Sequence, residues 1–362
     1  MCRLFYVQNP KKLIEKYGED VITDYLYYLI ESAGGHGNGL GGLIINNGKE
    51  KFYIAKGLGL TSDKSVELMK KKNWVNGAIW HTRLSSSGGI SSRLNHPFTD
   101  LDHILILAHN GHITYADTYL KILKMLDPRY KNYTYGYSTY TSYSGYYTTT
   151  YYKTTNNNKQ TTTVNDTWIL TNLIATLIKY SIISKQDIDR IMATVWKNTL
   201  SHDAVILQLW NGTVYLLVDR NDFEITELPE IGVVAASKGL SLLGANKILK
   251  GSGVIKIEPG KTQPHIVAGE FKEIYIKNKK KKKNKEKKGK IHETETPVKK
   301  LEEWFDTCYN ECLDAGYEVV WCNRICTEIA QNVDDEEELW DEIYTRLYGR
   351  TTIKDIPDEL FE

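Results

Sequence analysis

One stretch limits the fold of this chain more than any other: residues 104–108 form an unbroken apolar run that leads directly into His109-Asn110-Gly111. A short run of this kind, with no polar residue in it, is typical of a strand that is covered on both faces. Similar apolar segments recur at 75–81, 204–210 and 233–236, and segments with helical spacing lie between them. The sequence therefore predicts an α+β protein with buried strands and helices outside them.

The composition agrees with a globular protein. Hydrophobic residues make up 41% of the 362 residues, which is enough for a sizeable core and, at this length, for two domains. No apolar run at the N-terminus resembles a signal peptide, and no run of about 18 apolar residues could span a bilayer. We therefore expect a cytoplasmic protein that does not bind to membranes.

The net charge of +1 hides three segments of different charge. Residues 277–290 hold ten Lys and one Glu, whereas residues 291–362 hold 20 acidic and six basic residues, which leaves +6 on 1–276. We predict a domain at 1–276, a Lys-rich linker at 277–296 and an acidic helical region at 297–362. The Lys run is expected to be a solvated tether that binds the acidic tail or another polyanion.

Residues 129–163 form a low-complexity insertion, rich in Tyr and Thr, inside the first domain. No apolar periodicity that could build a core is found there. The missing pattern favours an exposed and poorly ordered segment, and a β-ribbon with Tyr on its faces is the alternative. Because the insertion precedes Asp166, it could overhang a pocket built around that residue.

Four of the five cysteines lie together in the acidic region, with the spacing C-x3-C, nine residues, C-x3-C: Cys308, Cys312, Cys322 and Cys326. Residues i and i+4 share a helix face, so two antiparallel helices could be joined by two disulfides, which is the favoured interpretation. Free core thiols and a structural zinc site are the alternatives, although zinc knuckles usually have tighter spacing. The fifth cysteine, Cys2, is left free to react.

Cys2 directly follows the initiator methionine. Removal of Met1 would leave a cysteine that carries a free α-amine, which titrates near about pH 8 and can accept a proton at cell pH. A thiol is the best nucleophile among the side chains. Nucleophile and base would then belong to one residue, and we expect Met1 to be removed.

Five short segments resemble, in the right order, motifs of the class II glutamine amidotransferases, a family of N-terminal nucleophile hydrolases. They are Cys2-Arg3-Leu4-Phe5, His81-Thr82-Arg83, Leu94-Asn95-His96-Pro97, His109-Asn110-Gly111 and Asp166-Thr167. The resemblance covers about residues 2–276, and an Ala-Ser segment that ends at Ser237 also fits it. Two apolar sheets with helices outside them predict a four-layer αββα sandwich.

The resemblance implies three catalytic residues. Cys2 would attack the δ-amide carbon of glutamine. The side-chain N–H of Asn110 and the backbone N–H of Gly111 would form the oxyanion hole, which is the kind of preorganised donor pair that acyl transfer needs. A simple turn at Asn110-Gly111 is the alternative interpretation. No cofactor is implied.

The resemblance also implies three residues that bind the substrate. Arg83 would bind the α-carboxylate of glutamine, Asp166 its α-ammonium group, and Ser86 lies where the family often has Thr. A surface ion pair for Arg83 and a helix cap for Asp166 are the alternatives. Leu84 and Ser87 replace the aromatic residue and the His of many members, so the contacts of a lid over the site do not follow from the resemblance.

Three histidines lie in these motifs, at positions 81, 96 and 109. They are expected to be structural because the α-amine supplies the base, and a Cys/His dyad is the alternative. The predicted function is ammonia release from glutamine through a γ-glutamyl thioester, with an unknown acceptor that belongs to a separate subunit. Hydrolysis of another γ-glutamyl or small amide without transfer, and a non-enzymatic structural or interaction role on the same fold, are the alternatives.

Overall fold

The computed structural model describes residues 2–33, 37–57, 60–84, 92–143, 146–152, 162–184, 187–220 and 222–276. The chain divides after Asn278 into two units, and every described residue belongs to the first. Ser86, the Lys run at 277–290 and the four clustered cysteines lie outside the described residues. None of the helices in the described part combines the length and the apolar composition that a membrane span requires.

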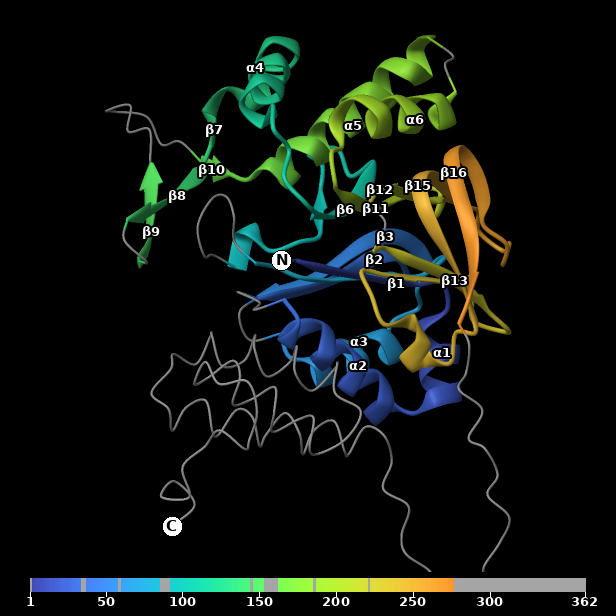
Figure 1. The fold of residues 1–362 in the computed structure, drawn as a ribbon. Coiled ribbons are helices and arrows are strands. Elements are labelled where there is room, and N and C mark those ends of the chain that lie inside the picture. Colours follow the sequence, from blue (N-terminus) through green and yellow to red (C-terminus); the bar gives the residue numbers. More distant parts are fainter. Residues whose placement is uncertain are drawn as a thin grey trace, which may run out of the picture. The chain divides into compact units, whose positions relative to one another are not determined.

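Twelve strands form one antiparallel sheet, shown in Figure 1. The strands are β1 Arg3–Val7, β2 Asn38–Asn46, β3 Lys49–Gly57, β4 Ala78–Thr82, β5 Phe98–Thr99, β6 Leu105–Asn110, β11 Ala204–Leu209, β12 Val214–Asp219, β13 Glu224–Leu228, β14 Gly232–Ala236, β15 Lys247–Ile257 and β16 His265–Tyr275. Their order is β3-β2-β4-β1-β14-β13-β15-β12-β11-β6-β5, and β16 pairs with β15. The strand predicted at residues 104–108 is confirmed: β6 spans Leu105–Asn110, and every residue in it is buried.

The prediction of a four-layer αββα sandwich is wrong, because the strands form a single large sheet that curves nearly into a barrel. The strand β15 joins the β1–β14–β13 part of the sheet to the β12–β11–β6 part. Its last half, from Ser252 to Ile257, pairs with β12, and Leu249 pairs with Ile225 of β13. The sequence indicated a strand only at 254–257. The first half of β15 reads Lys-Ile-Leu-Lys-Gly-Ser-Gly, which has no apolar pattern that could reveal the connection.

The inner face of the curved sheet packs against itself. Its buried core includes Leu4, Tyr6, Ile79, Ile106, Ala108, Ala204, Ile206, Val233 and Ala235. Gln208 of β11 crosses this interior, where its side chain accepts a hydrogen bond of 2.7 Å from the Leu43 N–H and donates to the Val75 carbonyl. The oxygen and the nitrogen of a buried amide both need hydrogen-bond partners, and these two bonds fix β11 against the β2 side of the sheet.

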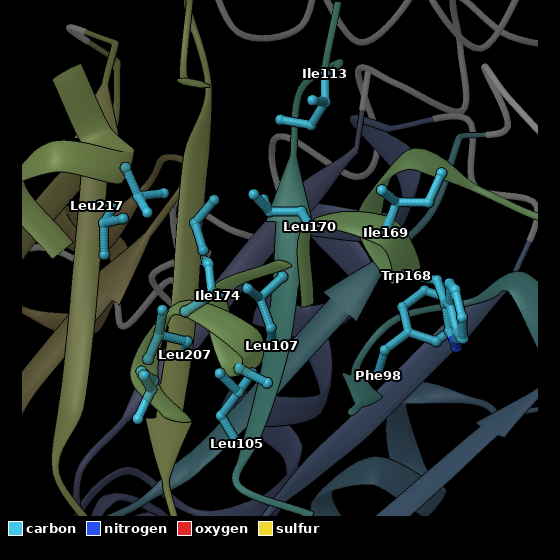
Figure 2. Close-up of a cluster of buried hydrophobic side chains, with 14 of the residues drawn as sticks. Phe98, Leu105, Leu107, Ile113, Trp168, Ile169, Leu170, Ile174, Leu207 and Leu217 are labelled. Atoms are coloured by element: carbon cyan, nitrogen blue, oxygen red, sulfur yellow. The ribbon is translucent and has the colours of Figure 1, made fainter. Parts of the chain in front are cut away.

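Six α-helices cover the outer face within the described residues: α1 Pro10–Tyr17, α2 Glu19–Glu31, α3 Ser62–Lys71, α4 Ala116–Leu126, α5 Asp166–Ser184 and α6 Ile188–Thr199. In Figure 1, α1–α3 lie on one side of the strands and α4–α6 on the other. Figure 2 shows Ile169, Leu170 and Ile174 of α5 together with Leu105 and Leu107 of β6. Full burial of such a side chain stabilises the fold by about 1.5–3 kcal/mol, so this contact fixes where α5 begins relative to the end of β6.

The described parts of the Tyr-rich insertion include paired strands, as in the ribbon alternative. Strand β8 Tyr137–Tyr143 pairs antiparallel with β9 Tyr146–Tyr152, and β7 Tyr133–Tyr135 runs parallel to β10 Thr162–Val164. The ends of the insertion also pack into the hydrophobic core, although the sequence predicted that no part of the insertion builds a core. The side chain of Tyr130 is buried, and the ring of Tyr133 stacks on that of Trp168 of α5, with the ring centroids 4.4 Å apart. These aromatic contacts anchor the insertion beside the first turn of α5.

Candidate active site

Strand register places Cys2 and Arg83 at the same end of the sheet. Strand β1 lies between β4 and β14, with Arg3 opposite Thr82 and Leu4 opposite His81. The next pair in this register is Cys2 and Arg83. Because side chains alternate along a strand, Cys2 shares the inner face with Leu4, and Arg83 shares it with His81.

Cys2 is partly buried and is held through its sulfur. The Leu84 N–H donates to Cys2 Sγ at 3.2 Å, and the thiol lies 3.5 Å from the Leu84 carbonyl oxygen. Burial raises the pKa of the Cys2 thiol, and the hydrogen bond with Leu84 and the nearby Arg83 charge offset only part of that effect. The thiol is therefore protonated at neutral pH and needs a base before it can act as a nucleophile.

Asn110 is the last residue of β6, its side chain lies on the inner face with those of Ile106 and Ala108, and Gly111 follows the strand. Asn110 pairs with Ala204 of β11, and its buried side chain donates from Nδ2 to the Ser237 hydroxyl at 3.3 Å. At Gly111 a Cβ atom would lie 1.5 Å from Asp203 Oδ1, so no side chain fits. Only glycine fits at position 111, because the Asp203 carboxylate packs directly against its backbone.

Asp203 holds the turn that comes after Asn110. The Asp203 carboxylate accepts hydrogen bonds from the His112 N–H at 2.8 Å and from the Ser201 N–H at 3.0 Å, and His109 Nε2 lies 3.5 Å away. The side chain is buried. Sequence reasoning missed this residue, since an aspartate just before a strand carries no motif of its own.

Asp166 is a buried anion at the start of α5. Its carboxylate accepts from the Thr167 N–H at 2.9 Å and from the Ile113 N–H at 3.1 Å, and His112 Nδ1 lies 3.4 Å away. Burial raises the pKa of the Asp166 carboxyl, but the hydrogen bond from His112, the nearby His109 and the Ile113 N–H outweigh it and lower that pKa to about 2. Asp166 is therefore ionised at every physiological pH, and its charge acts on the Cys2 thiol.

The helix-cap interpretation of Asp166 does not hold, because the preceding residue caps the helix. Asn165 Oδ1 accepts from the Trp168 N–H at 2.9 Å, and Asn165 Nδ2 donates to the Leu94 carbonyl at 3.1 Å. An Asn side chain that accepts from the N–H three residues on is the usual N-cap arrangement. The carboxylate of Asp166 instead holds the turn at 111–113 through the Ile113 N–H and lies beside His112.

The three motif histidines have structural contacts. The rings of His81 and His96 stack with their centroids 4.1 Å apart, and burial lowers the pKa of each well below 6.5, so both are neutral. His109 Nδ1 lies 3.2 Å from the Thr167 hydroxyl. In the residues that the structure describes, the hydrogen bonds of Cys2 Sγ go to Leu84, and these contacts agree with a structural role for the three rings.

The Ala-Ser segment of the resemblance ends at Ser237, but no motif revealed what this residue contacts. It follows β14 and lies opposite Leu4, with its N–H donating to the Leu4 carbonyl at 3.0 Å. Its hydroxyl accepts from the Leu4 N–H at 2.8 Å and from Asn110. The structure thus links the strand of Cys2 to the turn at Asn110 and Gly111. The role of Ser86 stays a prediction, because that residue lies outside the described part of the chain.

No group of three or more His, Cys, Asp or Glu side chains in the described ranges is arranged to hold a metal ion. A scan against protein-family models found no match, and neither did a search of curated proteins. Among solved structures, the chain is similar to a glutamine aminotransferase class-II domain protein from Silicibacter pomeroyi, with a TM-score of 0.37 and 11% identity over 74% of this chain and 99% of that one. At this TM-score the likeness is weak, and it assigns no role to any residue.

Proposed function

We propose that the first domain hydrolyses glutamine in the manner of a class II glutamine amidotransferase, with Cys2 as the N-terminal nucleophile. The observation that carries the proposal is the grouping of different chemical functions at one end of the sheet. A thiol, a guanidinium group and an ionised carboxylate come from Cys2, Arg83 and Asp166, and the charges of the last two act on the thiol. A buried amide donor, Asn110, lies on the same inner face, and Gly111 follows it in the chain.

In the proposed reaction, Cys2 Sγ attacks the δ-carbon of glutamine while the α-amine of Cys2 takes the thiol proton. The amine is required because burial raises the pKa of the thiol. Negative charge develops on the amide oxygen, and the Asn110 side chain and the Gly111 N–H donate to it. The ammonium group of Cys2 protonates the amide nitrogen, the C–N bond breaks and ammonia leaves. Water then cleaves the γ-glutamyl thioester, which gives glutamate and the free thiol of Cys2.

The opposite charges of Arg83 and Asp166 suit the head group of an amino acid. Glutamine carries a carboxylate and an ammonium group on one carbon, far from the scissile amide. The planar guanidinium of Arg83 can donate two parallel bonds to a carboxylate. The carboxylate of Asp166 stays ionised, since its pKa is about 2, and can accept from the ammonium group.

The proposal is tested by measuring ammonia release from glutamine together with the mass of the mature N-terminus. We expect turnover of glutamine by protein that begins at Cys2, and little turnover of simple amides that lack the α-amino acid group. An active preparation in which every molecule keeps Met1 would contradict the role of the α-amine. Equal turnover of simple amides would instead favour a general amidohydrolase.

We expect KM for glutamine to rise as the pH falls. The Asp166 hydrogen bond raises the pKa of His112 above 6.5, and Asp203 adds to this, while burial opposes it. Below that pKa a protonated His112 pairs with Asp166 and competes with the substrate ammonium group, so protons weaken glutamine binding. By linkage, the same pair stabilises the fold at pH values below the ordinary His pKa, and this stabilisation is lost as the pH rises through the raised pKa.

The His112→Asn variant isolates this effect from the titration of the Cys2 amine, which both proteins share. The ratio of kcat/KM in the variant to kcat/KM in the unmodified protein should increase steadily as the pH is lowered from 8.5 to 5.5, a range on both sides of about 6.5. A ratio that stays constant over this range would show that His112 does not compete for Asp166.

A further inference from the structure

Ser237 connects the strand that follows the nucleophile Cys2 to the proposed oxyanion donor Asn110. Its hydroxyl oxygen accepts from the Leu4 N–H at 2.8 Å on one side and from Asn110 Nδ2 at 3.3 Å on the other. Its backbone N–H donates to the Leu4 carbonyl at 3.0 Å. Ser237 and Asn110 are both about 1% exposed, so bulk water does not compete for these bonds.

The hydrogen bond from Asn110 to Ser237 uses only one of the two N–H groups of the Asn110 amide, and the proposed reaction needs the other. A carboxamide nitrogen carries two N–H groups. One of them is directed to the Ser237 hydroxyl, which fixes the plane of the amide and leaves the second N–H for a developing oxyanion. Without Ser237 the amide could rotate about its terminal torsion, which is intrinsically broad for Asn.

The other end of the same contact lies two residues from the nucleophile. Leu4 follows Cys2 by two positions on strand β1, and its side chain is on the same face of the sheet. Arg3, between them, is held separately by bonds from Nε to the Ser32 hydroxyl at 3.0 Å and from Nη2 to the Ser32 carbonyl at 2.9 Å. The start of β1 is therefore held by the Arg3 side chain and by the backbone of Leu4, and the Ser237 hydroxyl links it to Asn110.

We propose that Ser237 is a positioning residue for the reaction, whose hydroxyl holds the Asn110 oxyanion donor at a set distance from Cys2. This inference rests on the proposed glutamine hydrolysis. Misplacing one donor by a fraction of an ångström weakens the stabilisation of the transition state without removing the nucleophile or the groups that bind the substrate. Ser237 therefore affects kcat and not KM.

The test is a double-mutant cycle with Ser237→Ala and Asn110→Ala, measured on glutamine. Removing a whole oxyanion donor typically lowers kcat by about 10²–10³-fold, and we expect Ser237→Ala to lower it by about 10- to 100-fold with KM nearly unchanged. In the Asn110→Ala background, Ser237→Ala should lower kcat no further, because the group that it positions is gone. Additive losses of kcat would overturn the positioning role.

Two controls separate positioning from general damage. Ser65→Ala removes another buried serine, which accepts from Trp80 Nε1 at 3.2 Å on the α3 side of the sheet, and it should leave kcat unchanged. The rate of Cys2 alkylation by iodoacetamide should be the same in Ser237→Ala as in the unmodified protein. A slower alkylation that accounts for the whole loss of kcat would place the effect on the nucleophile and overturn the proposal.

If Ser237→Ala does not fold, Ser237→Thr and Ser237→Val give the same comparison, because these variants have nearly the same shape and differ in the hydroxyl. The threonine variant should keep at least about tenfold more kcat than the valine variant, on the same reasoning. Equal kcat values would overturn the role of Ser237 while leaving glutamine hydrolysis intact. An unmodified protein that releases no ammonia would instead overturn the proposed function, and the positioning role with it.

Discussion

Replacing Cys2 by alanine is expected to abolish ammonia release from glutamine. The substitution removes the sulfur that would form the thioester, and Cys2 is the one cysteine in the described part of the chain. His81 and His96 are neutral and stacked on each other, and His109 is directed to Thr167. The expected loss is at least about 10⁴-fold in kcat, as for other enzymes that lose their nucleophile.

The fold of the Cys2→Ala variant should be retained, because the side chain is small and only partly buried. Its thermal midpoint should change little, and its circular dichroism spectrum should match that of the unmodified protein. Acid quenching during turnover should trap a γ-glutamyl adduct on the N-terminal peptide of the unmodified protein and none on the variant. Unchanged ammonia release from the variant would place the nucleophile elsewhere or show that the activity comes from a contaminant.

The sequence was sufficient to predict the buried strand that the structure has at residues 105–110. A run that is apolar on both faces leaves little choice of structure, and Leu105 and Leu107 pack against α5 while Ile106 and Ala108 pack in the interior. The single curved sheet could not be predicted in the same way. It depends on the polar first half of β15, where pairing with β13 and β16 is decided by backbone hydrogen bonds and not by an apolar pattern.

The candidate site was predictable where a residue belongs to a local motif and not where it acts across the fold. Cys2, Arg83, Asn110 and Asp166 stand in short recognisable segments, and strand register brings the first two together. Ser237 lies far from Asn110 in sequence, and their strands are not neighbours in the sheet, so only the curvature of the sheet brings the two side chains into contact. The same holds for the carboxylate of Asp203 packed on Gly111.

Asp166→Asn is expected to raise KM for glutamine by about 30-fold or more, with a much smaller effect on kcat. Removing one partner of a desolvated charge pair typically costs about 2–5 kcal/mol, because the substrate ammonium group is left unpaired. Asparagine keeps an oxygen that can still accept from the Ile113 N–H, and Asn165 still caps α5. The loss should therefore lie in recognition and not in folding.

Arg83→Lys tests the other half of the same site. Lysine keeps the positive charge but cannot donate two parallel bonds, so KM should again rise strongly. Asp189→Asn is a matched control for Asp166→Asn. The Asp189 carboxylate is also partly buried and lies 3.2 Å from Lys256 Nζ, and its substitution should leave KM unchanged.

The rate of Cys2 alkylation separates the substrate-binding role from damage to the nucleophile. It should stay within a few-fold of the unmodified rate in both variants, because Arg83 and Asp166 affect the thiol only as secondary electrostatic influences after burial and the Leu84 bond. If both variants keep the original kcat/KM for glutamine, the two charges do not bind an amino acid head group. The substrate is then an amide without one.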